Sequence, residues 1–208
     1  MTRRCVIIGG GDCSKEIIES NVTENDFIIC ADSGYDFVIK THFSPDLLIG
    51  DFDSIKSSIC ENQKNIKLPV EKDVTDTEAA LNYAIDLGYK DFLILGGTGG
   101  RFEHTFANIS LICKCANSQL NCVMSDEKHK YMSIHNSKKE IDYKENQQIS
   151  VFAFGEKAYG VTEEGFHYTI KDYTLNPFEP LGISNDIISD KGIISVKNGT
   201  LLIIETKM

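Results

Sequence analysis

A short apolar run followed by two acids decides the fold of the first half of the chain: Leu47-Leu48-Ile49-Gly50-Asp51-Phe52-Asp53-Ser54. Its apolar part predicts a buried strand. Side chains alternate along an extended backbone, so Asp51 and Asp53 are expected to point the same way. Ligands of α/β sheets bind outside the carboxyl ends of the strands, where two carboxylates suit Mg²⁺ and a substrate phosphate. The alternative is a turn, which Asp and Gly favour for local reasons.

Further apolar runs in the first half predict an α/β fold with a mainly parallel sheet. They cover residues 6–8, 27–31, 47–49 and 92–95, and runs that are apolar throughout suit a sheet covered on both faces. Helical spacing predicts a helix over 76–87, capped by Thr75 and stopped by Gly88, and a second helix over 103–115. The second helix is expected to turn these side chains to the core: Phe106, Ala107, Ile109, Leu111 and Ile112.

Beyond about residue 125 helical periodicity gives way to short strand-like runs, at 149–154, 166–170, 192–196 and 201–205. The stretch 136–148 is expected to hold loop and strand. Lys197-Asn198-Gly199 predicts a hairpin between the last two runs, because Asn-Gly tolerates the positive φ angles of a type I′ turn. We therefore expect two domains: an α/β domain over 1–125 and an all-β domain, a sandwich or small barrel, over 126–208.

Composition limits the classes of partner. The net charge of −10 and the lack of a Lys/Arg run argue against nucleic-acid binding, although an acidic protein can still bind ATP at a local site. The seven cysteines show no Cys-x-x-Cys spacing and suit small buried side chains in a reducing compartment. No signal peptide and no apolar run of the ~20 residues that a membrane helix needs is present. We expect a cytoplasmic protein without a membrane partner.

A second acidic motif, Lys72-Asp73-Val74-Thr75-Asp76, stands at the start of the predicted helix. An acid in the first turn complements the helix dipole and needs no ligand, which is the structural alternative for Asp76. Together with Asp51 and Asp53, these acids put four carboxylates within reach of one crevice. Their mutual repulsion is unfavourable unless a cation lies among them.

A glycine-rich segment follows the fourth apolar run: Gly96-Gly97-Thr98-Gly99-Gly100-Arg101-Phe102-Glu103-His104. Glycines let backbone N–H groups close on an anion, and the helix that follows adds a favourable dipole, so the segment predicts a phosphate-binding loop. The guanidinium of Arg101 is suited to form bidentate hydrogen bonds with phosphate oxygens. His104 either contacts phosphate or packs in the first helical turn. The alternative for the whole segment is a glycine-rich turn used for packing.

Two other strand ends leave alternatives open. Gly9-Gly10-Gly11-Asp12-Cys13-Ser14 follows the first run but has Ser14 where a dinucleotide fingerprint needs its third glycine. Ala31-Asp32-Ser33-Gly34 ends the second run, where Asp32 either meets a ribose hydroxyl or takes part in a turn.

Five motifs occur in the order seen in thiamine pyrophosphokinases, and the chain resembles the compact bacterial form of that family over nearly its whole length. They are Ala31–Gly34, Pro45–Ser54, Lys72–Glu78, Gly97–His104 and Ile183-Ser184-Asn185. The resemblance implies a Rossmann-like catalytic domain, a C-terminal β-sandwich that binds thiamine, and a homodimer. It also implies transfer of diphosphate from ATP to thiamine with Mg²⁺ as cofactor, giving thiamine diphosphate and AMP.

The resemblance also implies residue roles, carried over by matching position. The catalytic set is Asp51, Asp53, Asp73, Asp76 and Arg101, and the metal set is Asp51, Asp53 and Asp76. The nucleotide set is Asp32, Ser33, Gly34, Thr98, Gly99, Gly100, Arg101 and His104, and the thiamine set is Asp76, Ser184 and Asn185. In two places the chain departs from its relatives. Glu103 stands where many carry Asp, and the chain has no Trp to stack on thiamine as some relatives do.

Two other functions compete with a kinase. A metal-dependent phosphohydrolase also uses acids and Mg²⁺ but transfers to water, so it releases products without thiamine. A nucleotide or thiamine sensor would bind without turnover, although a pure binder has little reason to keep a repulsive acid cluster. In the kinase, Asp73 or Asp76 is the expected general base for the thiamine hydroxyl.

Overall fold

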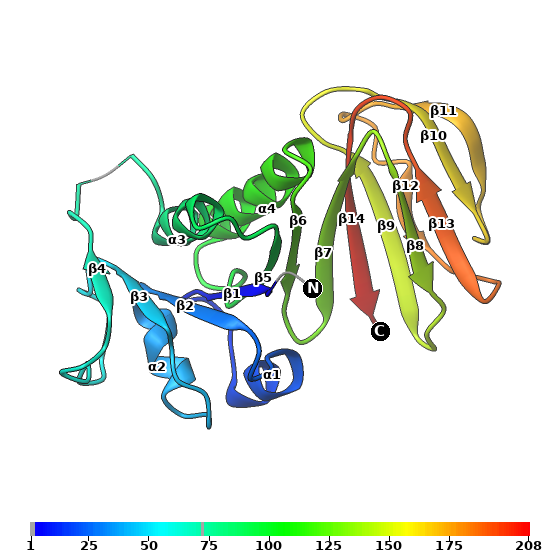
Figure 1. Cartoon of the computed structure of the whole chain (residues 1–208). Helices are drawn as coiled ribbons and strands as arrows, with labels where there is room; N and C mark the ends of the chain where they lie inside the picture. The colour runs from blue at the N-terminus through cyan, green and yellow to red at the C-terminus, as the bar shows by residue number, and fades with distance from the viewer. Residues whose placement is uncertain (1–2, 72) are drawn as a thin grey trace. The chain divides into compact units, whose positions relative to one another are not determined.

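Two compact units make up the chain (Figure 1). The computed structural model describes residues 3–71 and 73–208, so Lys72 of the second acidic motif lies outside the described residues. The first unit runs to Leu111 and includes Met124–Glu127, and the second holds Ile112–Val123 and Lys128–Met208. The chain therefore passes between the units twice before residue 125 and once after it.

A parallel sheet forms the centre of the first unit, as the apolar runs predict. Its strand order is β5-β1-β2-β3-β4, and each neighbouring pair is parallel. The strands are β1 (Cys5–Ile8), β2 (Phe27–Ala31), β3 (Leu47–Gly50), β4 (Asn65–Lys67) and β5 (Asp91–Leu95). All residues of β1 and β3 are buried, which explains why these runs carry no polar alternation.

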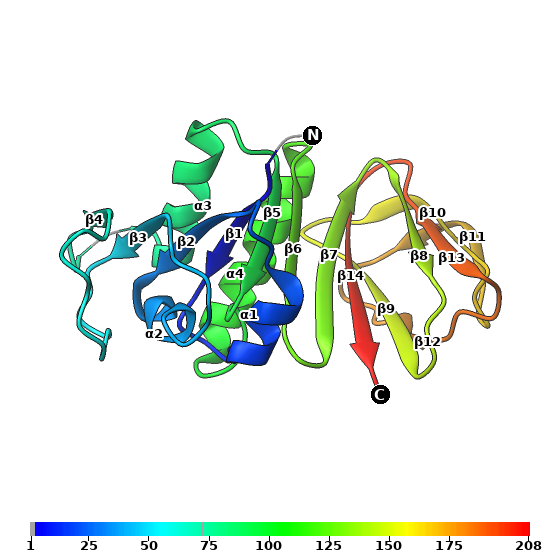
Figure 2. The ribbon, with the colours of Figure 1, turned by 60° about the horizontal axis from the view of Figure 1, so that its bottom comes forward.

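Helices cover both faces of this sheet, with α3 and α4 on one face and α1 and α2 on the other (Figures 1 and 2). They are α1 (Lys15–Asn21), α2 (Tyr35–Val38), α3 (Asp76–Asp86) and α4 (Phe102–Asn117), with a 3-10 turn, η1, at Asp32–Gly34. The predicted cap of α3 is confirmed, because the Thr75 hydroxyl accepts a hydrogen bond from the Glu78 N–H at 3.1 Å. The stop at Gly88 is confirmed by its φ of +90°.

The buried face of α4 differs from the predicted one. Phe106 is 54% exposed, so the expectation that it faces the core was wrong. Leu111 and Ile112 are buried as predicted, Ala107 and Ile109 are half-buried, and a buried stripe along the helix consists of Asn108, Leu111, Ile112 and Cys115. These four residues follow helical spacing, and Asn108 is included because its amide has a buried hydrogen-bond partner. A sequence pattern that counts only apolar residues therefore includes Phe106 in the buried face and misses Asn108.

The order of the strands creates a switch point beside β1. The chain builds β2, β3 and β4 on one side of β1 and then returns to place β5 on the other side. Connections after β1 and β5 therefore leave the sheet in opposite directions, and such a point opens a crevice at the carboxyl ends of the strands. The glycine-rich segments Gly9–Gly11 and Gly96–Gly100 follow these two strands.

Residues 128–208 of the second unit are all-β, as predicted, and their strands are antiparallel, whereas its other segment, Ile112–Val123, carries the end of α4. Strands β12-β9-β14-β7 are consecutive neighbours in the larger of the two sheets of the described chain, and β11-β10-β13-β8 form the smaller sheet. Their bounds, with that of β6 (Asn121–Ser125) at the sequence boundary of the units, are β7 (His129–His135), β8 (Lys138–Asp142), β9 (Gln147–Ala153), β10 (Ala158–Glu164), β11 (Ile170–Leu175), β12 (Gly182–Asn185), β13 (Lys191–Ser195) and β14 (Thr200–Lys207). One buried apolar cluster draws side chains from both sheets, including Ile149, Val161 and Ile194. The two sheets thus pack as the layers of a sandwich.

The predicted hairpin at Lys197-Asn198-Gly199 was wrong. Strand β13 pairs with β8 and β10, whereas β14 pairs with β7 and β9, so this connection carries the chain from one sheet to the other. Only Gly199 has positive φ, at +119°, and a type I′ turn needs two such residues. Asn198 instead forms an isolated bridge with Tyr159. The residues of this segment favour a tight turn, but the pairing of β13 and β14 with other strands determines the path of the chain.

The run predicted as a strand over 166–170 was wrong for most of its length. Phe166 makes only an isolated bridge to Ile187, and β11 begins at Ile170. The backbone of the intervening residues bonds instead to the segment after β12, for example through the His167 N–H and the Asp186 carbonyl at 2.8 Å.

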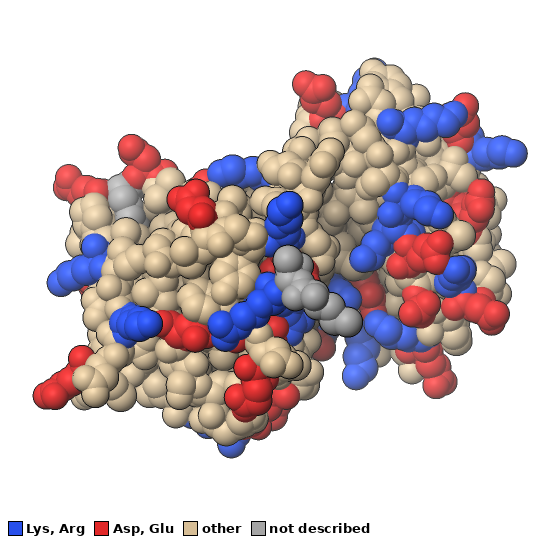
Figure 3. All heavy atoms as spheres, in the orientation of Figure 1, with Lys and Arg blue, Asp and Glu red and all other residues tan. Residues whose placement is uncertain are grey.

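On the face seen in Figure 3, Lys and Arg side chains are interspersed with Asp and Glu rather than gathered in one field. Among the described residues, none of the helices is long and apolar enough to cross a membrane. All the cysteines are free; Cys60 is exposed and Cys13 intermediate, while the others are buried, as expected for small apolar side chains.

Candidate active site

The acid stretch after β3 is a turn rather than an extension of the strand. The strand ends at Gly50, and Phe52 has a φ of +70°. The Asp53 N–H donates to Asp51 Oδ1 at 3.2 Å, the local bond that Asp favours in turns. The expectation that strand alternation aligns Asp51 and Asp53 was therefore wrong, because the backbone is not extended there. A tight turn brings the two carboxylates together instead.

A third acid joins this pair from the neighbouring strand end. Asp32 follows β2, and oxygen atoms of Asp32, Asp51 and Asp53 lie within 4.8 Å of one another. The Ser54 hydroxyl donates to Asp32 Oδ2, while Asp32 Oδ1 is buried without a hydrogen-bond partner among the described residues. A buried oxygen without a donor is unfavourable in the free protein. The arrangement is that of a site able to receive a hard cation.

The charges of this acid group act on one another. A hydrogen bond to Asp51 and the charge of that acid raise the pKa of Asp53, and Asp32 and Asp76 add to the effect. Like charges at short range disfavour full ionisation of the group. A divalent cation would reverse this, because it favours the ionised form of every acid around it.

The two glycine-rich segments pack against each other at the switch point. The Gly11 N–H donates to the Gly96 carbonyl at 2.9 Å, and the Asp12 N–H donates to the Thr98 carbonyl at 2.6 Å. Gly99 has a φ of +81°, and a Cβ at this residue would overlap the Asp12 carboxylate. Only glycine fits both the backbone angle and the space. The loop therefore keeps its backbone close to the pocket.

Two side-chain hydrogen bonds fix the glycine-rich loop after β5. The Asn108 amide donates to the Gly97 carbonyl at 2.8 Å, and the Thr98 hydroxyl donates to Asp126 Oδ2 at 3.0 Å. Asn108 and Thr98 are both 6% exposed, so these bonds are shielded from water. These bonds restrict the conformational freedom of the loop.

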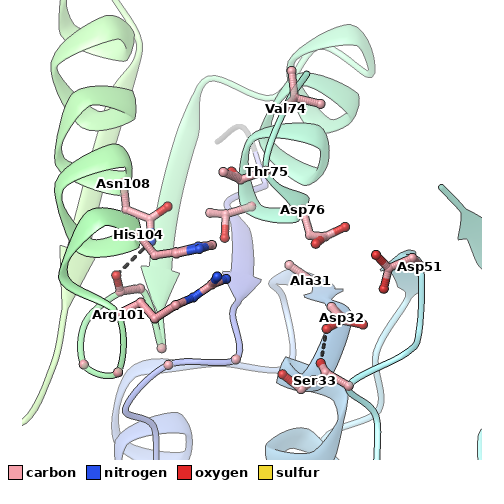
Figure 4. A pocket seen from close by; sticks show the side chains of 18 of the residues that line it. Ala31, Asp32, Ser33, Asp51, Val74, Thr75, Asp76, Arg101, His104 and Asn108 are labelled. Atoms are coloured by element: carbon pink, nitrogen blue, oxygen red, sulfur yellow. Dashed lines mark hydrogen bonds between the residues drawn. The ribbon is translucent and has the colours of Figure 1, made fainter. Parts of the chain in front are cut away.

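The acid group and the glycine-rich loop after β5 line one pocket of the first unit, which has a volume of about 710 Å³ (Figure 4). Figure 4 shows Arg101 and His104 reaching in from the side of α4, with Asp76, Asp32 and Asp51 on the other side. The expected site residues that line the pocket are Asp32, Ser33, Asp51, Asp53, Asp73, Asp76, Thr98, Gly99, Gly100, Arg101 and His104. The Arg101 side chain is 72% exposed and lies 3.7 Å from Glu103 Oε1, so it is free to move toward a ligand.

Gly34 is not among the lining residues. It is buried in η1 against the Ile8 carbonyl, where a Cβ would overlap that oxygen. Its contribution is close packing of η1 on β1, which helps to fix the position of Asp32.

Ser184 and Asn185 lie in the second unit, on β12. Ser184 is exposed with a φ of +56°, in a backbone region that side chains other than glycine rarely adopt. Asn185 is 5% exposed and accepts and donates hydrogen bonds through its side chain. The sequence motif thus contains one residue that faces solvent and one that is fixed inside.

Several site residues escaped sequence reasoning or were given another role. Asp32 was assigned to the nucleotide and not to the acid group. Gly10 and Gly11 line the pocket although their fingerprint is incomplete, and the run of three glycines after a strand was the available signal. Asn108 carried no signal, because its role depends on a carbonyl eleven positions earlier in the chain.

Family models cover most of the chain. Residues 18–124 match the model described as thiamin pyrophosphokinase, catalytic domain. The chain belongs to the thiamin pyrophosphokinase family. Residues 132–201 match the model of the thiamin pyrophosphokinase vitamin B1 binding domain, so the order of the two domains also agrees. The prediction of a thiamine diphosphokinase is confirmed at the level of the family.

Individual thiamin pyrophosphokinases are similar to this chain over nearly their whole length. The chain is 28% identical to thiamine pyrophosphokinase of Bacillus subtilis over 192 residues, which cover 88% of each protein. The crystal structure of the Bacillus subtilis enzyme superposes with a TM-score of 0.90 at 24% identity, over 99% of this chain and 100% of that chain. The crystal structure of thiamin pyrophosphokinase from Geobacillus thermodenitrificans superposes with a TM-score of 0.87 at 25% identity, over 99% of this chain and 98% of that chain.

Proposed function

We propose that the pocket of the first unit binds ATP and transfers its terminal diphosphate to thiamine, giving thiamine diphosphate and AMP. One observation carries this proposal: an acid group and a glycine-rich loop with Arg101 line the same pocket. Acids that hold Mg²⁺ and a cationic, amide-rich loop are the two parts that phosphoryl-transfer sites need. The strand order supports a Rossmann-like use of the sheet, with the nucleotide bound at the switch point beside β1.

Residues of the acid group fit Mg²⁺. Asp32, Asp51 and Asp53 offer oxygens within 4.8 Å of one another, and no described residue donates a hydrogen bond to the buried Asp32 Oδ1. Carboxylates with remaining positions for water and phosphate match the preference of this ion. When bound, Mg²⁺ supplies charge neutralisation at the phosphate oxygens. The family resemblance assigns Asp76 to the metal as well, and that assignment stays a prediction beside the three-acid group.

The transfer is an in-line displacement at the β-phosphorus of ATP. The hydroxyl oxygen of thiamine forms a bond to this phosphorus, the bond from the phosphorus to the α–β bridging oxygen breaks, and AMP leaves with that electron pair. The hydroxyl proton passes to a carboxylate of Asp73 or Asp76, which lie outside the three-acid group. Arg101 and the amides of Thr98 to Gly100 stabilise the charge on the transferred group.

Thiamine recognition is proposed for Ser184 and Asn185 of the second unit, with Asp76 as an acid partner. Ser184 is exposed and able to contact a ligand directly, whereas the side chain of Asn185 is engaged inside the fold. A homodimer, a cytoplasmic location and the lack of a nucleic-acid partner stay predictions from the family and the composition.

Product analysis tests the proposed function. Purified protein is mixed with ATP and Mg²⁺, with and without thiamine, and the nucleotides and thiamine esters are separated. We expect AMP and thiamine diphosphate in equal amounts, and only with thiamine present. Release of AMP or ADP without thiamine would instead identify a phosphohydrolase, and thiamine binding without turnover would identify a sensor.

A further inference from the structure

Glu163 is a buried acid that the proposed transfer does not use. It lies in β10, opposite Ile170 of β11 and Ile194 of β13, and is only 4% exposed. Its Oε2 accepts a hydrogen bond from the Asn185 amide at 3.1 Å, and its Oε1 has no hydrogen-bond partner among the described residues. Burial raises the pKa of Glu163, and the bond from Asn185 opposes that rise. An acid is rarely kept in such a position unless it has a task.

Within the described part of the chain, Asn185 is the hydrogen-bond partner of that acid, and all polar groups of the Asn185 side chain are engaged. Its Oδ1 accepts from the N–H of Tyr168 at 3.0 Å and of Asp186 at 3.1 Å. Its Nδ2 donates to the Tyr168 carbonyl at 2.7 Å and to Glu163. These partners fix which end of the amide is oxygen and which is nitrogen. No capacity is left for a direct hydrogen bond to a ligand.

Through these bonds Asn185 joins β12 to the segment that precedes β11. Further bonds reinforce the junction, because the Ile188 N–H donates to the Gly165 carbonyl at 2.9 Å. The neighbouring residue, Ser184, is held at a φ of +56°, and its N–H donates to the Ser150 hydroxyl at 3.1 Å. An unfavourable backbone angle persists only where the surroundings enforce it. Fixing Asn185 from the inside therefore also fixes the exposed Ser184.

We propose that Glu163 is a positioning residue for thiamine binding: it orients the Asn185 amide, and through it the Ser184 peptide, without touching the substrate. This inference rests on the proposed function, because it assigns Ser184 to the thiamine site. Asn185 accordingly acts on thiamine indirectly. The acceptor oxygen of residue 163 is the essential group, and its negative charge is not.

Substitutions at Glu163 separate these contributions. Glu163→Gln keeps an acceptor for the Asn185 amide and removes the charge. Glu163→Leu removes the acceptor oxygen and keeps a side chain of similar volume. Glu163→Asp keeps the carboxylate but moves it away from the Asn185 amide, because the side chain is shorter. It is the milder variant should the Leu protein fail to fold. The matched control is Thr200→Val, because Thr200 is also buried in the second unit, but its hydroxyl bonds to Asn117 and His135.

The readout is KM for thiamine compared with KM for ATP, on the full chain. We expect thiamine KM to rise about tenfold in Glu163→Leu and about threefold in Glu163→Asp, from the loss of one buried hydrogen bond. ATP KM is expected to stay unchanged in both, and Glu163→Gln and Thr200→Val are expected to keep both constants near wild type. A purely structural role would not separate the two substrates in this way.

Other outcomes overturn the inference. Folded Leu or Asp variants with unchanged thiamine KM would show that the acceptor is unimportant, and equal changes in both KM values would show a general loss of structure. If Glu163→Gln behaved like Glu163→Leu, the charge and not the acceptor would matter. The wild-type protein is assayed first, so a failure to form any thiamine diphosphate would count against the proposed function and be recognised separately.

Discussion

Asp53 of the first unit and Glu163 of the second are both acids with a raised pKa, but the cause differs. Asp53 is exposed, and a neighbouring acid, Asp51, raises its pKa. Glu163 is buried, and loss of water raises its pKa. A bound cation can relieve repulsion between exposed acids, whereas only hydrogen-bond donors inside the fold can relieve burial. The first arrangement is therefore suited to ligands and the second to positioning.

Asp26 offers a third arrangement, in the first unit. It is as buried as Glu163, at 6% exposed, but its carboxylate accepts hydrogen bonds from Arg4 at 2.7 and 3.0 Å. Burial acts to raise the pKa of Asp26, and the hydrogen bonds from Arg4 and the Thr23 N–H outweigh it, so the pKa is lowered. The three acids show that burial alone does not decide the ionisation of a carboxyl group.

The largest expected effect comes from the exposed acid group. Asp51→Asn removes a carboxylate from it, and we expect kcat/KM to fall about a hundredfold or more, as for loss of one main electrostatic contact. Stability is expected to stay level or rise, because repulsion is relieved. Steady-state kinetics and thermal unfolding test both parts. The matched control is Asp86→Asn, because Asp86 is an exposed acid at the end of α3. Wild-type activity in Asp51→Asn would show that this acid group takes no part in the reaction.

The paired acid can be converted into an unpaired one. Arg4→Met leaves Asp26 buried without its cation, and we expect a loss of about 2–3 kcal/mol in unfolding free energy, at the low end for a buried pair because Arg4 is partly exposed. Urea denaturation measures this loss. Because the folded pKa of Asp26 is lowered, its stabilising contribution is present above the unfolded pKa and is lost as the pH falls through the folded value. Asp26→Asn added to Arg4→Met should recover part of the loss, and no recovery would contradict the pairing.

The glycine loop should respond to one substitution more than to its neighbour. Gly99→Ala meets the Asp12 carboxylate, whereas a Cβ at Gly100 has nothing within 4 Å, although both residues have positive φ. Both variants carry backbone strain of about 1 kcal/mol. We expect ATP KM to rise about tenfold further in Gly99→Ala, as a displaced amide contact would. Asp12→Ala should partly relieve Gly99→Ala, and equal effects at the two glycines would rule out the overlap as the cause.

The smallest expected effect is on stability at Glu163. Its folded pKa lies above the unfolded value, so its contribution to stability is full below the unfolded pKa and is lost as the pH rises through the folded one. Glu163→Gln cannot ionise and should become the more stable protein toward neutral pH, by on the order of 1 kcal/mol. Denaturation at acid and neutral pH measures the difference. A gap that does not grow with pH would mean that Glu163 ionises as easily folded as unfolded.

Residue patterns predicted the local elements well where the signal lay in adjacent positions. Strand β2 matches the predicted run, and Thr75 and Gly88 bound α3 as expected. Prediction failed where partners lie far apart in sequence. The turn at Asn198-Gly199 has hairpin chemistry but joins strands of different sheets, and on α4 the polar Asn108 is buried whereas the apolar Phe106 is exposed.

The sequence by itself determined the classes of the two units, the family and most acids of the pocket, because apolar runs, caps and ordered motifs depend on neighbouring residues. Only the tertiary structure decided that Asp32 joins Asp51 and Asp53. Ala31 pairs with Ile49 across parallel strands, so the two strand ends meet. It also decided that Glu163 is buried against Asn185, twenty-two positions away. Such contacts arise from strand pairing between distant segments, which no local pattern encodes.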